Sequence, residues 1–196
     1  LLEHLILLGS TRIHSGEDIV EKQIKQYGFY FNAHTQPDVT TLELSSFKPY
    51  WKEGLALMEQ KLFQLDFTEE EVAREKQVID EELKTKLDKP AQFGLQKLFK
   101  HIFKDHPYQL PVGGDPEIIR KLTKDQLTEH YKTYFTAGNT ALAIVGDIEL
   151  KAAEAEVRTR FENYPSTPFK QSKIPDALPI QKKQVLTHQM DVEQSH

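Results

Sequence analysis

Strand-forming and helix-forming patterns occupy separate parts of this sequence, and this separation constrains the fold more than any other feature. Two short segments rich in β-branched and aromatic residues, Phe29–His34 and Val39–Ser46, are predicted strands, and the turn "TQPD" between them indicates an antiparallel pair. A third apolar segment, residues 139–146, is also predicted to be a short strand. Because strands are grouped apart from several helices, the sequence predicts an α+β fold with an antiparallel or mixed sheet.

Helical periodicity covers most of the remaining chain. The first helix is expected from Leu1 to Leu8, where Gly9 ends it. A second begins at Ser15, which can form a capping box with Asp18. Further helices are predicted at about 49–65, 68–87, 90–103 and 151–163, and two more after the N-caps Asp115 and Thr123.

The composition changes near the C-terminal end of the sequence. Four prolines occur among lysine, glutamine and serine between Tyr164 and Gln184, a composition typical of a linker. Residues 185–196 then have the pattern of a new strand. We therefore predict a domain over residues 1–163, a linker over residues 164–184 and the start of a second domain at residues 185–196.

Composition excludes several classes of function. The 196 residues carry a net charge of −5 with acidic and basic side chains interleaved, so we expect no nucleic-acid partner. The absence of cysteine excludes disulfides and thiolate metal sites and leaves the cellular compartment open. No apolar run approaches the roughly 20 residues of a membrane span, so we expect no membrane partner either.

Glu3 and His4 lie side by side within the apolar first helix. A residue four positions before His4 would share its helical face, and a histidine there would complete the H-x-x-E-H motif of inverted zinc peptidases. Two imidazoles one turn apart can bind one zinc ion, and the adjacent glutamate can reach the water on the metal. An amphipathic helix end that happens to carry two polar residues is the alternative.

Two carboxylates of the helix predicted at 68–87 lie beside its apolar face, which is formed by Val72, Ile79 and Leu83. Glu75 and Glu82 are seven residues apart and project within roughly 20° of each other, whereas Glu81 points to the opposite side. Carboxylates beside a buried face need a positive partner, which a metal ion or an arginine or lysine could provide. A solvated acidic helix capped by Thr68 is the simpler alternative.

Taken together, these segments resemble the pitrilysin/insulinase family of zinc metallopeptidases, which includes the mitochondrial processing peptidases and bacterial relatives. The resemblance extends from Leu1 to about Asn163 and is carried by "LLEHLILLGS", "SGEDIVEKQIKQYGFYFNAHTQPDVTTLEL", "FTEEEVAREKQVIDEEL" and "HPYQLPVGGDPEIIRKLTKDQLTEHYKTYFTAGNTALAIVGDI". It implies one half of a two-halved clamshell peptidase. It also predicts truncation at both ends, with the first zinc histidine just before Leu1 and the second homologous half beginning at residues 185–196.

The resemblance assigns roles to individual residues. His4 and Glu82 would be zinc ligands, and Glu3 would be the general base that takes a proton from the zinc-bound water. Glu75 would be a supporting carboxylate behind the ligands, and Glu81 would replace Glu82 if the register were shifted by one. Asn32 and Ala33 match the edge strand to which a substrate backbone adds as a further strand.

The implied function is a zinc-dependent endopeptidase acting on oligopeptides or on unfolded, presequence-like peptides. Its partners would be the peptide substrate and a second homologous half or partner subunit. The chain alone is expected to bind little zinc and to be inactive, because the first zinc histidine would precede Leu1. The alternatives are a non-catalytic family member that acts as a partner subunit or scaffold, and an unrelated α+β binding module.

Overall fold

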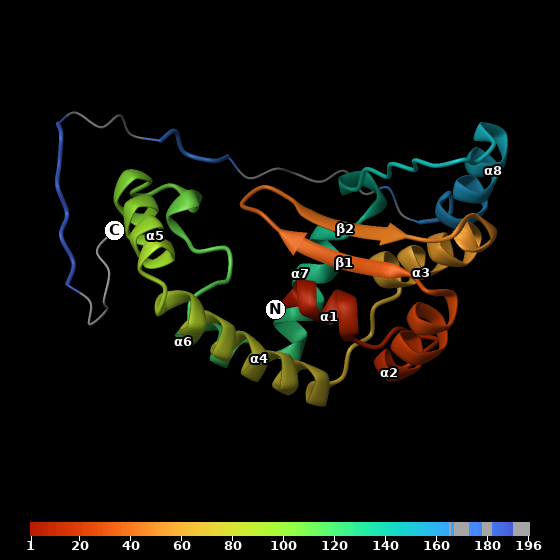
Figure 1. Cartoon of the computed structure of the whole chain (residues 1–196), viewed down its shortest axis with the longest axis horizontal. Coiled ribbons are helices and arrows are strands. Elements are labelled where there is room, and N and C mark those ends of the chain that lie inside the picture. Colours follow the sequence, from red (N-terminus) through yellow and green to blue (C-terminus); the bar gives the residue numbers. More distant parts are fainter. Residues whose placement is uncertain (165, 167–172, 178–181, 190–196) are drawn as a thin grey trace. The chain divides into compact units, whose positions relative to one another are not determined.

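The computed structural model describes residues 1–164, 166, 173–177 and 182–189, and its contacts divide the chain into two compact units (Figure 1). The first unit comprises residues 1–75 and 122–170, and the second comprises residues 76–121 and 171–196. Helix α4 (Glu69–Leu87) contributes to both units, because the division falls between Glu75 and Lys76. The predicted linker at 164–184 and second domain at 185–196 lie largely outside the described residues, and these boundaries stay predictions.

The first unit combines a β-hairpin with several helices. Strands β1 (Tyr30–Thr35) and β2 (Thr40–Ser45) pair antiparallel, with Tyr30 opposite Ser45 and Thr35 opposite Thr40. The helices are α1 (Leu2–Leu8), α2 (Gly16–Asp18), α3 (Trp51–Phe63), the start of α4, α7 (Lys124–Tyr134) and α8 (Leu150–Phe161), with 3-10 turns at Lys48–Tyr50 and Ala137–Asn139. Helix α1 packs on β1 and α3 packs on β2, which confirms the predicted α+β class.

Two hydrophobic clusters hold the first unit together. The larger cluster joins α1, α4 and α7 and contains Leu5, Ile6, Leu65, Phe67, Val72, Leu127 and Tyr131. The smaller cluster consists of Ile19, Phe29 and Leu57. Burial of each large apolar side chain stabilises the fold by about 1.5–3 kcal/mol relative to exposure. Helix α1 is therefore fixed mainly by Leu5 and Ile6, which are fully buried.

The second unit contains the C-terminal part of α4, helix α5 (Pro90–Ile102), a 3-10 turn at Pro107–Gln109 and helix α6 (Pro116–Lys121). Ile79 and Leu83 of α4 are buried there, as the apolar face of the sequence predicted. An ion pair of 2.5 Å between Arg120 Nη2 and Asp80 Oδ1 links α6 to α4. The unit is thus organised around the apolar face of α4.

The predicted N-caps Ser15 and Thr123 are confirmed in position. Ser15 Oγ accepts a hydrogen bond of 3.1 Å from Asp18 N, and Gly28 has the positive φ of 65° that suits a helix end. Thr123 forms a reciprocal capping box with Gln126 at the start of α7. One detail differs from the prediction, because the helix after Ser15 continues as a π-helix over Ile19–Lys25.

The prediction of a strand at residues 139–146 is wrong. Residues 140–145 form no strand, and Val145 is 97% exposed. A strand needs a neighbour for its hydrogen-bond ladder, and within the described ranges only β1 and β2 pair as strands. Residues 185–189 are likewise not in a strand, and the rest of that predicted strand, residues 190–196, lies outside the described residues.

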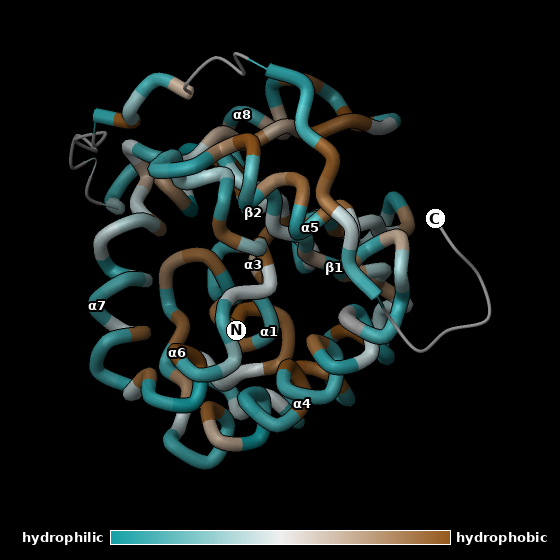
Figure 2. The backbone as a smooth tube through the Cα atoms, turned by 90° about the vertical axis from the view of Figure 1, so that its left-hand side faces the viewer, coloured by the Kyte–Doolittle hydropathy of each residue, from teal (hydrophilic) through white to brown (hydrophobic). Residues whose placement is uncertain are grey.

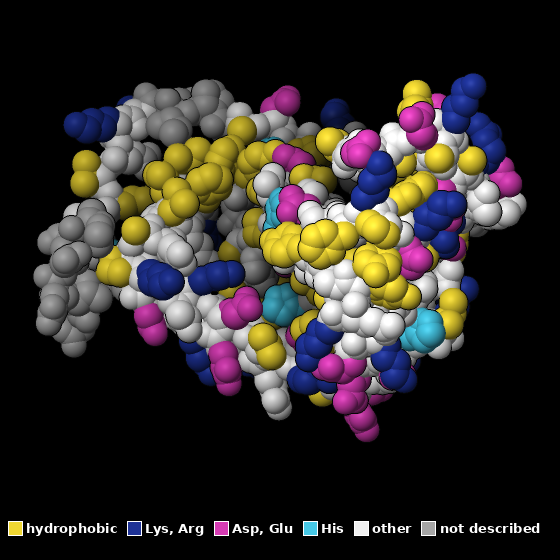
Figure 3. Space-filling model, turned by 45° about the vertical axis from the view of Figure 1, so that its right-hand side comes forward, with side chains coloured by type: hydrophobic (Ala, Val, Ile, Leu, Met, Phe, Trp, Pro, Cys, Tyr) yellow, Lys and Arg dark blue, Asp and Glu magenta, His cyan; other side chains and the backbone are white. Residues whose placement is uncertain are grey.

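The surface carries side chains of both charge signs among polar and apolar residues. Along the backbone, hydrophilic and hydrophobic residues alternate over the turns of α4 and α7 (Figure 2). On the face drawn in Figure 3, basic and acidic side chains are interspersed and form no broad patch of one sign. Among the helices that the structure describes, none is long and apolar enough to cross a membrane.

Candidate metal centre

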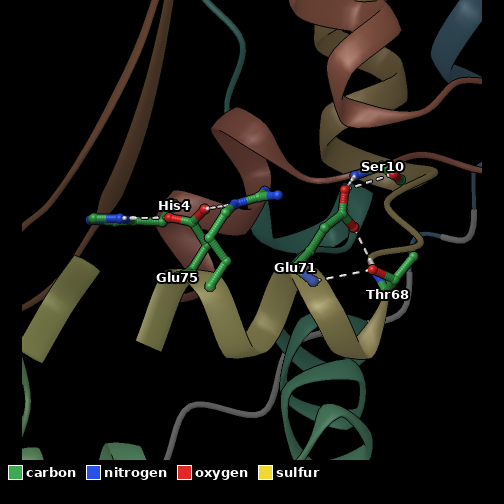
Figure 4. A network of polar contacts seen from close by, with 6 residues as sticks. His4, Ser10, Thr68, Glu71 and Glu75 are labelled. Carbon is green, nitrogen blue, oxygen red and sulfur yellow. Dashed lines mark hydrogen bonds and ion pairs between the residues drawn. The ribbon is translucent and has the colours of Figure 1, made fainter. Parts of the chain in front are cut away.

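Helix α1 brings His4 against a buried carboxylate of α4. His4 Nδ1 lies 3.3 Å from Glu75 Oε2, and the two side chains are 19% and 2% exposed (Figure 4). Burial of the adjacent Leu5 and Ile6 fixes the rotation of α1, and this rotation directs His4 toward α4. The contact joins residues 71 positions apart in the sequence.

The carboxylate of Glu75 is compensated on both of its oxygens. Oε2 faces His4, and Oε1 accepts a hydrogen bond of 3.0 Å from Arg74 Nε. A buried carboxylate is costly without such partners. From the sequence, either a metal ion or an arginine or lysine was expected to compensate this carboxylate. In the described structure, the imidazole of His4 and the guanidinium of Arg74 contact it.

The contact between His4 and Glu75 has one feature that suits a metal-bound histidine. Histidines that bind metals commonly donate their second ring N–H to a carboxylate, which fixes the tautomer and the ring orientation. With Nδ1 engaged by Glu75, His4 would bind a metal through Nε2. Imidazole nitrogen and carboxylate oxygen are ligands that zinc accepts. Within the described part of the chain, no group of three or more His, Asp or Glu side chains is placed to hold a metal.

Glu3 is held by the sheet. Its Oε2 accepts a short hydrogen bond from Thr35 Oγ1 at the end of β1, and Thr35 Oγ1 is also 3.4 Å from Thr40 Oγ1 of β2. Glu3 therefore has a fixed position beside His4. The sequence analysis did not identify Thr35, because a threonine in a strand carries no signal of its own.

Glu81 and Glu82 lie in the second unit, about two helical turns after Glu75 on α4. Both are exposed, and Glu82 Oε2 lies 3.9 Å from Lys86 Nζ. His4 and Glu75 belong to the first unit. Zinc binding by Glu82, with Glu81 as the alternative register, stays a prediction.

Asn32 and Ala33 occupy the middle of β1. Asn32 is opposite Glu43 and donates a hydrogen bond of 3.2 Å from Nδ2 to Tyr30 OH. Ala33 is opposite Leu42, and only 6% of it is exposed. Both residues lie on a strand with one described neighbour, so their predicted role in docking a substrate backbone stays open to test.

Sequence analysis missed a second set of contacts between α1 and its neighbours. Ser10 donates from both N and Oγ to Glu71 Oε1, at 3.0 and 2.7 Å, and Glu71 Oε2 accepts from Thr68 N at 2.8 Å (Figure 4). Lys61, which is fully buried, donates from Nζ to Gly9 O at 2.6 Å. The spacing of Thr68 and Glu71 is that of a capping box, a signal that could have drawn attention to Glu71.

Comparison with known protein families identifies the family to which the sequence is similar. Residues 1–115 match the family model described as insulinase (peptidase family M16). Residues 121–196 match the model described as the peptidase M16 inactive domain. The two matches together extend over nearly the whole chain, and the first contains α1, β1 and α4.

Individual relatives of the chain carry the names of proteases. An uncharacterized zinc protease of Rickettsia bellii is 26% identical over 162 residues, which cover 83% of this chain and 39% of that protein. The mitochondrial presequence protease of Drosophila melanogaster is 28% identical over 165 residues, covering 74% of this chain and 16% of that protein. The chain thus spans well under half the length of these relatives.

The fold has a close counterpart among solved structures. The crystal structure of a peptidase M16 inactive domain from Pseudomonas fluorescens superposes with a TM-score of 0.81 at 23% identity. The match covers 91% of this chain and 43% of that one. At this level of identity, the likeness concerns the fold.

Proposed function

Because the chain belongs to the insulinase family of peptidases, peptidase family M16, we propose that it provides a zinc-binding half of an endopeptidase. One observation carries the proposal: His4 faces the buried carboxylate of Glu75, directly beside Glu3. The relative from Rickettsia bellii is named a zinc protease, which supports the same chemistry. A second homologous half or a partner subunit would complete the enzyme.

In the proposed mechanism, His4 and Glu82 would hold zinc, and Glu75 would orient the imidazole of His4. Bound zinc would supply the Lewis acidity that makes water nucleophilic at neutral pH and polarises the scissile carbonyl. Glu3 takes the proton of the attacking water and passes it to the leaving amine. The hydroxyl of Thr35 holds the Glu3 carboxylate in position for both transfers.

We propose that the substrate is an oligopeptide or an unfolded, presequence-like peptide. Its backbone would add to β1 as a further strand, with the main chain of Asn32 and Ala33 as its contacts. Backbone pairing tolerates many substrate sequences, which suits a peptidase of unfolded peptides. The relative from Drosophila melanogaster is named a presequence protease, which supports this class of substrate.

The role of Glu3 is tested by Glu3→Gln in the full-length protein. The change removes the base and leaves the metal ligands, so we expect zinc to be retained and kcat to fall by about 10²–10⁴-fold. Zinc content is measured by elemental analysis and turnover with a fluorogenic presequence peptide. Glu17→Gln, an exposed carboxylate of α2, is the matched control. A zinc-loaded wild type that cleaves no peptide would favour the non-catalytic partner subunit instead.

The ligand on α4 is tested by comparing Glu82→Gln with Glu81→Gln. The two residues are adjacent and both exposed, so the variants differ only in the helical face that they alter. We expect Glu82→Gln to lose zinc and Glu81→Gln to keep it. The reverse pattern would show that the register assigned to α4 is wrong by one residue.

A further inference from the structure

We propose that Glu71 is a positioning residue that fixes α1 against α4 and so holds His4 and Glu3 in place. This inference rests on the proposed function, because it concerns the same site. Glu71 itself is not placed at the metal, since within the described structure its carboxylate accepts hydrogen bonds from Ser10 and Thr68. Glu71 would affect the site by holding α1, the helix that carries His4.

The orientation of α1 is set by the contacts along its buried face and at its ends. Leu5 and Ile6 set which face of α1 is buried, but apolar contacts are not directional and define the position of the helix along its axis less well. Hydrogen bonds at the two ends can fix that axial position.

The two oxygens of Glu71 bind different segments. Oε1 accepts from Ser10 N and Ser10 Oγ, in the loop directly after α1, and Oε2 accepts from Thr68 N to cap α4. Glu71 N in turn donates to Thr68 Oγ1 at 3.1 Å. Glu71 is 8% exposed, so these donors satisfy a buried carboxylate. One side chain thus joins the end of α1 to the start of α4.

Other contacts hold the same loop. Ser10 Oγ accepts a hydrogen bond of 3.0 Å from Gly16 N at the start of α2. Gly9 O accepts from Lys61 Nζ of α3. The backbone of the loop also pairs with residues 64–66, because Arg12 N donates to Gln64 O and Asp66 N donates to Ser10 O. The loop is therefore held from three directions, and Glu71 provides its link to α4.

Glu71 and Glu75 are one turn apart on α4 and hold α1 at two points. Glu75 contacts His4 near the start of α1, and Glu71 contacts Ser10 just after its end. These two contacts to the same helix, together with the buried face of α1, define the direction of α1 along α4. The imidazole of His4 therefore depends on Glu71 even though the two side chains bind different partners.

The test uses Glu71→Gln in the full-length protein. Glutamine at this position still caps α4, because a capping box accepts either residue. It replaces one carboxylate oxygen with an amide NH₂, which cannot accept from Ser10. We expect zinc affinity, measured by chelator competition, to fall about 10-fold, at the lower end of the effect of groups behind metal ligands. We expect kcat to fall with little change in KM.

Three variants separate positioning from stability. Glu70→Gln makes the same charge change at an exposed residue in the same turn and should leave zinc affinity unchanged. Thr68→Ala removes the cap hydroxyl and should lower the melting temperature without changing zinc affinity. Ser10→Thr keeps both donors to Glu71 and should behave like the wild type.

Ser10→Ala provides a second route if Glu71→Gln does not fold. It removes one donor to Glu71 and should lower zinc affinity by less than Glu71→Gln, and it should add little in the double variant because both changes break the same link. A folded Glu71→Gln or Ser10→Ala with wild-type zinc affinity and kcat would refute the positioning role alone. A wild-type protein that binds no zinc would overturn the proposed function and, with it, this role.

Discussion

The side chain of Lys61 has no exposure to solvent. Burial lowers the pKa of Lys61 from 10.5 to about 7, and the charge of Glu71 opposes this shift only in part. The side chain reaches Gly9 O, so it also ties α3 to the loop after α1. A titrating group in the core of the first unit makes the stability of that unit depend on pH.

The sign of this dependence follows from the two pKa values of Lys61. Between pH 7 and about 10.5 the unfolded chain binds the proton more tightly, so the free energy of unfolding rises with pH. Below pH 7 the lysine is charged in both states and its burial is fully unfavourable. We predict that the stability of the wild type relative to Lys61→Met increases from pH 7 to pH 10, as measured by urea unfolding.

Lys52→Met is the matched control for that measurement. Lys52 lies on the same helix, and its side chain is 56% exposed. Its removal should change the stability by a similar amount at every pH from 7 to 10. If the difference between the wild type and Lys61→Met is also independent of pH, burial does not lower the pKa of Lys61 in the folded protein.

Glu75 is the second residue whose replacement is informative. Glu75→Gln keeps the size of the side chain and removes the charge that faces His4 Nδ1. We predict a loss of zinc affinity of roughly 10–100-fold in the full-length protein, the range for groups that orient metal-bound histidines. Chelator competition measures it, with Glu70→Gln as the exposed control. Unchanged affinity would mean that Glu75 does not support the metal.

Among the elements, β1 offers the sharpest test of substrate docking. Ala33→Pro removes one N–H and fixes φ, so the backbone at this point can no longer take part in a regular ladder. We predict a large rise in KM, measured with the presequence peptide, in a protein that stays folded and zinc-loaded. Ala33→Ser keeps the N–H, although it places a hydroxyl at a buried position, and should have a mild effect.

Circular dichroism and zinc content accompany the kinetics of both Ala33 variants, because proline can disturb the hairpin itself. Ala33 is paired with Leu42, so loss of the hairpin would appear as a loss of β signal. A folded, zinc-loaded Ala33→Pro protein with unchanged kcat/KM would exclude β1 as the docking edge.

Elements with local signals could be predicted from the sequence, and elements that depend on a distant partner could not. Thr123 and Ser15 begin helices as expected, because a cap and its partner are three residues apart. The strand at 139–146 was predicted from its own apolar residues, whereas a strand also requires a neighbour. Pairing of β1 with β2 was predictable because a short turn connects them.

The same distinction applies to the candidate site. Helical spacing identified Glu75 as a carboxylate beside a buried face, and the family resemblance identified His4, but no pattern in the sequence joins Ser10 to Glu71 across 61 residues. Lys61 follows Leu57 by one turn on a buried face, a position where a lysine is unusual. That spacing was visible in the sequence, although its partner, Gly9 O, was not.

At the scale of the whole molecule, α4 is the element that both units share. The proposed ligand Glu82 and its supporting residue Glu75 lie on opposite sides of the division, so only the continuity of α4 sets their spacing. Gln77 lies between them and is exposed. Gln77→Pro should interrupt the helix at a cost of about 3 kcal/mol or more.

We predict that Gln77→Pro abolishes zinc binding in the full-length protein, whereas Gln77→Ala retains it. Elemental analysis of the purified proteins measures the metal, and circular dichroism reports how much helix is lost. Retention of zinc by a folded Gln77→Pro variant would show that Glu82 is placed by contacts other than those along α4.

The separation of the site residues along the chain also has a consequence during synthesis. His4 leaves the ribosome 71 residues before Glu75, an interval of roughly 4–14 s at about 5–20 residues per second. During this time Leu5 and Ile6 have no core to enter, because the other members of their cluster, Leu65 to Tyr131, have not all been made. The nascent chain therefore carries this apolar segment uncovered until α7 emerges, and the candidate site is among the last parts of the first unit to form.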